Sequence, residues 1–177
     1  GPAMADVLDK LMSLEIVQKR APINDPTNKR KSGYFVVDPL SLFYYRYVFR
    51  NASARQLLDP EVFYDRHVFQ DFEENYVPHM FEEICRQYLV RQNRTGKIEP
   101  AFDAIGKYWY DDPANKTSGE FDVVTQDPEG YAFYEAKFRK SPITQKRVDE
   151  EIAQVEATGL KCHRYGFFSR SGFEAGE

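Results

Sequence analysis

Four charged side chains lie in a short stretch of the sequence that otherwise has the pattern of a β-hairpin. Residues 119–137, GEFDVVTQDPEGYAFYEAK, contain Glu120, Asp122, Glu135 and Lys137. Strand interiors are usually poor in such residues, because burying a charge is costly unless it is paired or binds an ion. Two carboxylates beside a lysine could bind Mg²⁺ or Mn²⁺ and act on a phosphodiester. The charges therefore predict a site.

The turn of this hairpin decides which charges face one another. It reads Asp127-Pro128-Glu129-Gly130, and a loop of either two or four residues places Asp122 directly across from Glu135. Their Cβ atoms would then lie about 4.5–5.5 Å apart, where two carboxylates repel unless a cation lies between them. A three-residue loop with Gly130 in a bulge would instead place Asp122 opposite Ala136. We favour the first register because it groups the charges.

The alternation of side chains along the hairpin separates packing from charge. Lys137 is two residues beyond Glu135 and therefore points to the same face of the sheet. On that face Asp122 and Glu135 would hold the metal ion, while Lys137 would orient the attacking water and stabilise charge on the phosphorus. We expect the opposite face to be a continuous apolar row, formed by Phe121, Val123, Tyr134, Ala136 and Phe138.

Length and composition limit the classes of protein. The 177 residues suffice for one well-packed domain with an appendage, and hydrophobic residues make up 42% of them. A formal net charge of -4 excludes a general basic field, so binding to nucleic acid needs a local patch. No apolar run approaches the ~20 residues of a membrane-spanning helix, and the two cysteines have neither zinc nor redox spacing. We expect a cytoplasmic protein with reduced thiols.

The first part of the chain is expected to have three segments. Residues 1–4 are interpreted as a cloning remnant, residues 5–51 as a partial winged helix with a connecting helix, and residues 52–76 as a linker. The winged helix is predicted from a helical pattern over Ala5–Ser13 and from two strands separated by a polar loop, over Glu15–Arg20 and Tyr34–Asp38. Asp38-Pro39 then starts the connecting helix, with the aspartate as its N-cap.

The loop of the winged helix contains a short basic run, Lys29-Arg30-Lys31. As the wing, this run would contact DNA phosphates. A merely solvated loop would have the same composition, so both interpretations stay open.

Residues 77–177 are expected to form the domain that carries the hairpin. Pro78 opens a helix whose predicted apolar stripe is Val77, Phe81, Ile84 and Tyr88, with Met80, Cys85 and Leu89 flanking it. This stripe places Glu82 at the edge of the buried face. A strand, AIGKYWY, precedes the hairpin; a helix that starts at Ser141-Pro142 and a last strand over Cys162–Phe168 follow it. The order helix, three strands, helix, strand predicts an α/β domain with a mixed sheet.

At these residues the sequence resembles the PD-(D/E)XK nuclease superfamily. Asp122 matches its aspartate, Glu135-Ala136-Lys137 its (D/E)XK tripeptide, and Glu82 the additional acidic residue that many members carry on the first core helix. The resemblance implies a restriction-endonuclease-like core and catalysis by these residues with Mg²⁺ or Mn²⁺. It also implies a nucleic-acid substrate, DNA in preference to RNA.

Longer blocks resemble the C-terminal domain of archaeal and bacterial DEXX-box ATPases, a family of poorly defined function. These blocks are YVPHMFEEICRQYL, IGKYWY, GEFDVV, YEAKFRKSPI and FFSRSGF. The resemblance implies that an ATPase module lies on the N-terminal side of this segment in a longer chain. The sequence has no GxxxxGK(S/T) motif, so ATP binding is not expected in it. It also stops soon after the last strand, where related cores continue into another helix.

Two other interpretations are open. The charged strands could form a salt-bridged, solvent-facing sheet without catalysis. The fold could also be a degenerate nuclease that serves as an inactive DNA-binding or regulatory module of the ATPase. We interpret Glu120 as a solvated neighbour of the site, and we interpret as structural the histidines that match no metal spacing, which are His67, His79 and His163.

Overall fold

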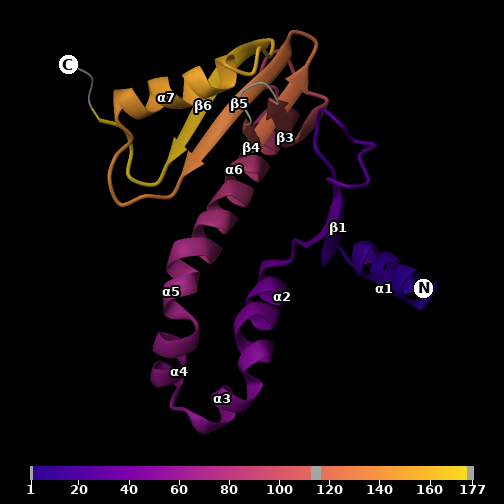
Figure 1. Ribbon diagram of the computed structural model, residues 1–177, viewed down its shortest axis with the longest axis vertical. Helices are drawn as coiled ribbons and strands as arrows, with labels where there is room; N and C mark the ends of the chain where they lie inside the picture. The colour runs from indigo at the N-terminus through magenta and orange to yellow at the C-terminus, as the bar shows by residue number, and fades with distance from the viewer. Residues whose placement is uncertain (1, 113–116, 175–177) are drawn as a thin grey trace. The chain divides into compact units, whose positions relative to one another are not determined.

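The computed structural model describes residues 2–112 and 117–174. The chain divides into two compact units (Figure 1). The first unit holds Gly1–Arg20 and Lys29–Val77, and the second holds Ala21–Asn28 and Pro78–Glu177. No helix among the described residues is both long and apolar enough to cross a membrane.

The first unit begins with a helix and a two-stranded sheet. Helix α1 (Pro2–Ser13) precedes strands β1 (Val17–Arg20) and β2 (Gly33–Val36), which pair antiparallel with Val17 opposite Val36. The predicted order of helix, strand, loop and strand is therefore confirmed. Asp38 caps the next helix as expected, because its carboxylate accepts a hydrogen bond of 2.7 Å from the Ser41 backbone N–H.

The rest of the first unit is helical, including residues 52–76, where we expected a linker. Its elements are α2 (Pro39–Phe43), a π-helical turn (Tyr44–Val48), a 3-10 turn (Phe49–Asn51), α3 (Ala52–Leu57), α4 (Pro60–His67), α5 (Phe69–Asp71) and a second π-helical turn (Phe72–Tyr76). The pair Asp59-Pro60 starts α4 in the same way as Asp38-Pro39 starts α2, since Asp59 accepts a hydrogen bond of 2.9 Å from the Glu61 backbone N–H. The linker prediction overlooked this helix start signal.

Aromatic rings and one carboxylate hold these helices together. The rings of Phe43, Tyr47, Phe72 and Tyr76 pack against one another. Asp71 accepts two hydrogen bonds from the Arg46 guanidinium, of 2.6 and 2.8 Å, and one of 2.8 Å from the Tyr47 hydroxyl. These donors lower the pKa of Asp71, because they favour its charged form, Arg46 most strongly.

The second unit is a four-stranded mixed sheet with two long helices. Its elements are α6 (Val77–Arg94, of which Val77 belongs to the first unit), β3 (Ala104–Asp112), β4 (Thr117–Asp127), β5 (Gly130–Lys137), α7 (Gln145–Glu156) and β6 (Cys162–Ser169). The strand order is β3-β4-β5-β6, with antiparallel pairs except for the parallel pair β5-β6. The predicted α/β class and the order helix, three strands, helix, strand are confirmed.

The two helices pack on opposite faces of this sheet. Leu89 of α6 lies in one apolar cluster with Val123 and Tyr134, whereas Val155 of α7 lies in another with Val124 and Phe133. Successive residues of each strand therefore divide between the two clusters, as the alternation of a strand requires. Figure 1 shows α7 beside β5 and β6.

The apolar stripe predicted for α6 is wrong in its phase. Ile84 and Tyr88 are 60% and 50% exposed, whereas Cys85 and Leu89 are only 3% and 4% exposed. The buried face is therefore turned by one residue: Leu89 packs in one cluster with Val123, and Cys85, four residues earlier, lies on the same buried face. Periodicity alone does not distinguish these two phases in a helix that has apolar residues on both.

The loop between β1 and β2 contributes to the second unit. The Ile23 backbone N–H donates a hydrogen bond of 2.7 Å to the Lys107 carbonyl, and the Asn24 side chain exchanges hydrogen bonds of 2.7 and 3.1 Å with the Trp109 backbone. Strand β3 lies at the edge of the sheet, so these contacts satisfy edge groups that would otherwise be open to another strand.

Asp71→Asn should destabilise the first unit by about 1–2 kcal/mol, a discounted figure because the Asp71 side chain is 41% exposed. The lowered pKa means that the wild-type contribution is present above the unfolded value of about 3.9 and is lost as the pH falls. Urea denaturation at neutral pH and at low pH measures both effects. Asp65→Asn, an exposed position on α4, is the matched control; equal losses in the two variants would contradict the prediction.

Candidate functional site

The β4–β5 hairpin has the register that the charges favoured. Asp127 pairs with Gly130, so the loop consists of Pro128 and Glu129, and the ladder continues to the pair Val123 and Tyr134. The Asp127 carboxylate accepts a hydrogen bond of 2.8 Å from the Glu129 backbone N–H, which closes the turn. The ladder ends one residue before Asp122 and Glu135, and it has the register in which these two residues would face one another.

A β-bulge lies at this point of β4. Gly106 of β3 pairs with Val124, but Tyr108 pairs with Phe121, so Asp122 and Val123 together oppose Lys107. The extra residue changes which face of the sheet the preceding side chains point to. Phe121 therefore packs with Val124 on the face covered by α7. The expected continuous apolar row is wrong for Phe121, whereas Val123 and Tyr134 do share the α6 face.

The bulge gives Asp122 a lysine partner. The Lys107 ammonium lies 2.9 Å from the Asp122 carboxylate and 2.6 Å from that of Glu120. Burial lowers the pKa of Lys107, but the two carboxylates outweigh this effect and the net pKa is raised. Glu120, expected to be a solvated neighbour of the site, thus shares its lysine with Asp122.

Glu135 and Lys137 share a face, as the spacing predicted. Their side chains form an ion pair and are only 21% and 16% exposed. The Lys137 ammonium also lies 3.0 Å from Glu151 of α7, whose side chain is 13% exposed and which in turn contacts Arg147 at 2.8 Å. The result is a half-buried chain of alternating charges between β5 and α7.

Burial dominates the electrostatics of Glu135. Its pKa is raised chiefly because the carboxylate is removed from water; Lys137 opposes the rise, while the charges of Glu151 and Asp122 add to it. Asp122 is therefore close enough for its charge to act on Glu135. A cavity of about 20 Å³, room for one water molecule, is lined by Glu135 and Glu151 among its neighbours.

The structure thus forms two carboxylate–lysine pairs, Asp122 with Lys107 and Glu135 with Lys137. The other predicted site residues, Glu82 and the basic run Lys29-Arg30-Lys31, take no part in these two pairs. Glu82 lies 3.9 Å from His79, and burial together with the Glu82 charge raises the pKa of Cys85 to about 11. The basic run Lys29-Arg30-Lys31 is exposed and belongs to the first unit.

Asp122 and Glu135 are the two strand carboxylates that the sequence predicts as metal ligands. Within residues 2–112 and 117–174, no group of three or more His, Cys, Asp or Glu side chains is arranged to hold one ion. Two carboxylates nevertheless fit Mg²⁺, which is usually bound by one or two of them while waters and phosphate oxygens complete its shell. An ion at this position would take over the role of the two lysines as the partner of the carboxylates.

Sequence reasoning missed Lys107, Arg147 and Glu151. A signal for Glu151 was present, since it lies three residues after Val148 and four before Val155 and thus on the buried face of α7. A glutamate on an apolar helix face needs a cationic partner, which Lys137 supplies. Lys107 carried no such signal, because only the bulge directs Asp122 towards it.

Comparison with known proteins places the chain among proteins without an assigned activity. Residues 44–152 match the family described as archaea bacterial proteins of unknown function. The matched segment includes four predicted site residues, Glu82, Asp122, Glu135 and Lys137, together with Glu151. The uncharacterized protein MJECL04 of Methanocaldococcus jannaschii is 27% identical over 103 residues, which are 58% of this chain and 23% of that protein. No solved structure matches the chain.

Glu135→Gln should make the protein more stable at neutral pH, because the folded state disfavours the charged carboxylate. A raised pKa means that the Glu135 contribution is fully present below the unfolded value of about 4.3 and is lost as the pH rises through the folded pKa. The gain in melting temperature over wild type, measured with EDTA present, should therefore shrink towards zero as the pH falls to about 4.

The matched control for this experiment is Glu156→Gln, at the exposed end of the same α7. It should change the melting temperature little at any pH. A Glu135→Gln variant that melts below wild type at neutral pH would contradict the prediction, because the ion pair with Lys137 would then outweigh the cost of burial.

Proposed function

We propose that this chain, which belongs to a family of archaeal and bacterial proteins of unknown function, carries a metal-dependent nuclease domain in its second unit. The reaction is hydrolysis of phosphodiester bonds in nucleic acid, with DNA preferred to RNA. The observation that carries the proposal is the half-buried pair of Glu135 and Lys137 on one face of β5, within electrostatic reach of Asp122 at the bulge.

Each residue has a chemical role in this proposal. Asp122 and Glu135 would hold Mg²⁺ or Mn²⁺, which when bound supplies a Lewis acid for the phosphate and lowers the pKa of water. Lys137 orients the attacking water and stabilises the negative charge that develops on the phosphoryl oxygens. Glu82, on α6, is assigned a supporting role towards the metal or a second ion.

Glu151 is assigned the role of positioning Lys137. Its carboxylate lies 3.0 Å from the ammonium and 2.8 Å from the Arg147 guanidinium, two ion-pair contacts. A lysine held from the side of α7 has fewer orientations open to it, which favours turnover rather than substrate affinity. Glu151 touches neither metal nor substrate in this proposal.

A second candidate function is a non-catalytic module that binds nucleic acid or regulates an ATPase. The specific observation in its favour is that both carboxylates already have lysine partners, Lys107 and Lys137, so the site is neutralised by the protein itself. This chain spans 23% of the length of its M. jannaschii relative. The ATPase module on the N-terminal side, expected from sequence resemblance, remains part of the proposal.

Asp122→Asn should reduce metal-dependent cleavage of DNA by at least about 100-fold, because it removes one of two charged donors to the ion. The measurement is cleavage of single-stranded, duplex and branched DNA with Mg²⁺ or Mn²⁺. Asp103→Asn, an exposed position that precedes β3, is the matched control and should cleave as wild type does. Wild-type protein that cleaves none of these substrates with either metal would exclude the nuclease and favour the module.

Glu151→Gln should lower kcat by about 10- to 100-fold with little change in KM, as expected for the loss of a supporting contact. Glu150→Gln changes the neighbouring, more exposed carboxylate of α7 and is the matched control. Steady-state kinetics on one DNA substrate separates the two constants. If both variants had wild-type kcat, Glu151 would have only a structural role.

A further inference from the structure

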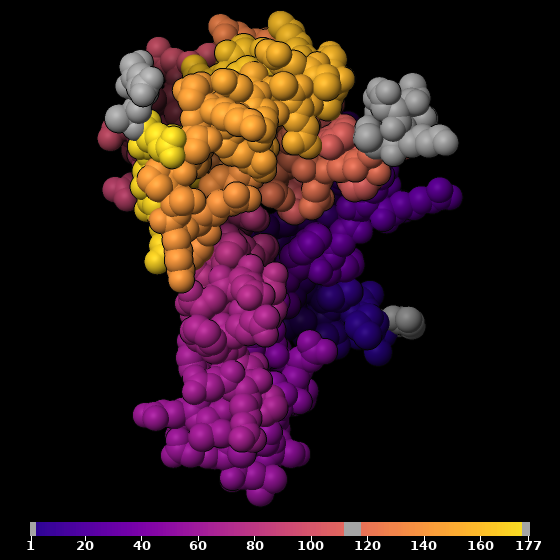
Figure 2. Space-filling view, turned by 60° about the vertical axis from the view of Figure 1, so that its left-hand side comes forward, coloured from indigo at the N-terminus to yellow at the C-terminus, as the bar shows by residue number. Residues whose placement is uncertain are grey.

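Two loops meet directly after β5, which carries Glu135 and Lys137, and after its parallel neighbour β6. The segment 138–144 follows β5, and the segment 169–174 includes the end of β6 and the residues after it. The Ile143 backbone N–H donates a hydrogen bond of 3.0 Å to Gly172, and the Ser171 hydroxyl donates one of 2.6 Å to the Arg139 carbonyl. Ile143 also forms a parallel bridge with Phe173. Orange and yellow atoms of the two loops adjoin at the surface in Figure 2.

Three exposed cations project from these loops, and we name them the basic rim: Arg139, Lys140 and Arg170. The Arg170 guanidinium lies 4.5 Å from the centre of the Phe138 ring, which itself packs against Phe81 of α6 at 5.4 Å. Within the described part of the chain, no carboxylate forms an ion pair with any residue of the rim. By contrast, Lys146 and Arg147, a few residues further on, do pair with acids of α7.

The rim is unusual in this protein because the chain as a whole carries a net charge of -4. Unpaired cations at one place create a local positive potential in an otherwise acidic molecule. The nearest described acid in the two loops is Glu174, whose backbone bonds to Ile143, so the rim keeps an excess of positive charge. Such a surface fits a chain of phosphates.

The position of the rim beside the proposed site indicates which polyanion it binds. The Arg170 backbone N–H donates a hydrogen bond of 3.2 Å to the Lys137 carbonyl, so the rim begins at the residue assigned to the attacking water. We infer that the basic rim binds the phosphate backbone of a nucleic acid and sets it against the site of Glu135 and Lys137. This inference rests on the proposed function and assigns backbone contact to the second unit, separately from the expected wing Lys29-Arg30-Lys31.

The test is binding of a short, labelled DNA duplex, measured by fluorescence anisotropy in EDTA so that cleavage plays no part. The triple variant Arg139→Gln, Lys140→Gln and Arg170→Gln should bind at least about 10-fold more weakly at low salt. Its plot of log Kd against log salt concentration should be shallower by about 2–3, since each phosphate contact contributes roughly 0.9 to the slope. Thermal melting shows whether the triple variant is folded. The double variant Arg139→Gln and Lys140→Gln keeps the contact of Arg170 with Phe138. It should reduce the slope by two-thirds of the amount expected for the triple variant.

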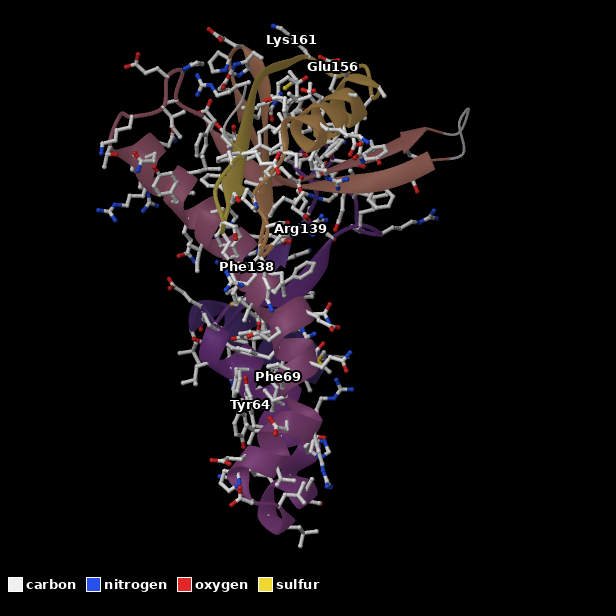
Figure 3. The ribbon with its side chains drawn as sticks, turned by 90° about the vertical axis from the view of Figure 1, so that its left-hand side faces the viewer. Tyr64, Phe69, Phe138, Arg139, Glu156 and Lys161 are labelled. Carbon is white, nitrogen blue, oxygen red and sulfur yellow. The ribbon has the colours of Figure 1, made fainter. Side chains whose placement is uncertain are left out.

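A second triple variant, Arg94→Gln, Lys97→Gln and Lys161→Gln, removes the same charge from exposed positions of the second unit and should bind as wild type does. Figure 3 shows Lys161 at one end of this unit and Arg139 towards the other. Equal losses in the two triple variants would overturn the inference, as would wild-type affinity in the rim variant, or loss of binding only on substitution of Lys29-Arg30-Lys31.

Two further outcomes separate the inference from the proposed function. Wild type that binds DNA through the rim but cleaves it with neither Mg²⁺ nor Mn²⁺ upholds the inference and rejects the nuclease. Wild type that cleaves DNA although the rim variant binds normally rejects the inference alone. Binding to anionic lipid vesicles without binding to DNA also overturns it.

Discussion

The pairing of β4 with β5 is the constraint on which the rest of the site depends. A two-residue turn fixes this register, and a bulge at Asp122 and Val123 interrupts the neighbouring pairing of β3 with β4 where the charges begin. At the bulge the carboxylate of Asp122 contacts Lys107, while Glu135 and Lys137 lie on the face that α7 covers. A shift of one residue would exchange the faces of these side chains and would bury the charges among apolar neighbours.

Ion pairs with lysine allow the two carboxylates to lie in the same site in the folded protein, and the proposed metal ion would replace these lysines as their partner. Each carboxylate has an ammonium partner, so the repulsion that two facing acids would create is relieved within the protein. Glu135 nevertheless keeps a raised pKa, because burial destabilises its charged form by more than Lys137 stabilises it. A divalent ion would provide two charges where each lysine provides one, and it is this difference that would favour metal over lysine as the partner of the carboxylates.

The parts of the structure that follow from short-range rules were predictable. The turn residues located the hairpin and the grouping of charges selected its register, while the period of two predicted the shared face of Glu135 and Lys137. Asp38-Pro39 predicted a helix start. The parts that depend on packing between elements were not. The bulge and the phase of α6 arise from how the sheet and helices fit together, which no local pattern encodes. The place of Glu151 on the buried face of α7 had a local signal, but the identity of its partner, Lys137, had none. The helix α4, within 52–76, was predictable from Asp59-Pro60 but was overlooked.

The central claim is that Asp122 and Glu135 act together to hold one divalent ion. Isothermal titration calorimetry of Mn²⁺ into the purified protein tests it most directly, because binding is measured without a substrate or a reaction. The account predicts one site of sub-millimolar affinity that is lost in both Asp122→Ala and Glu135→Ala and kept in Asp103→Ala. Absence of binding to wild type, or binding that survives either of the first two substitutions, would contradict it.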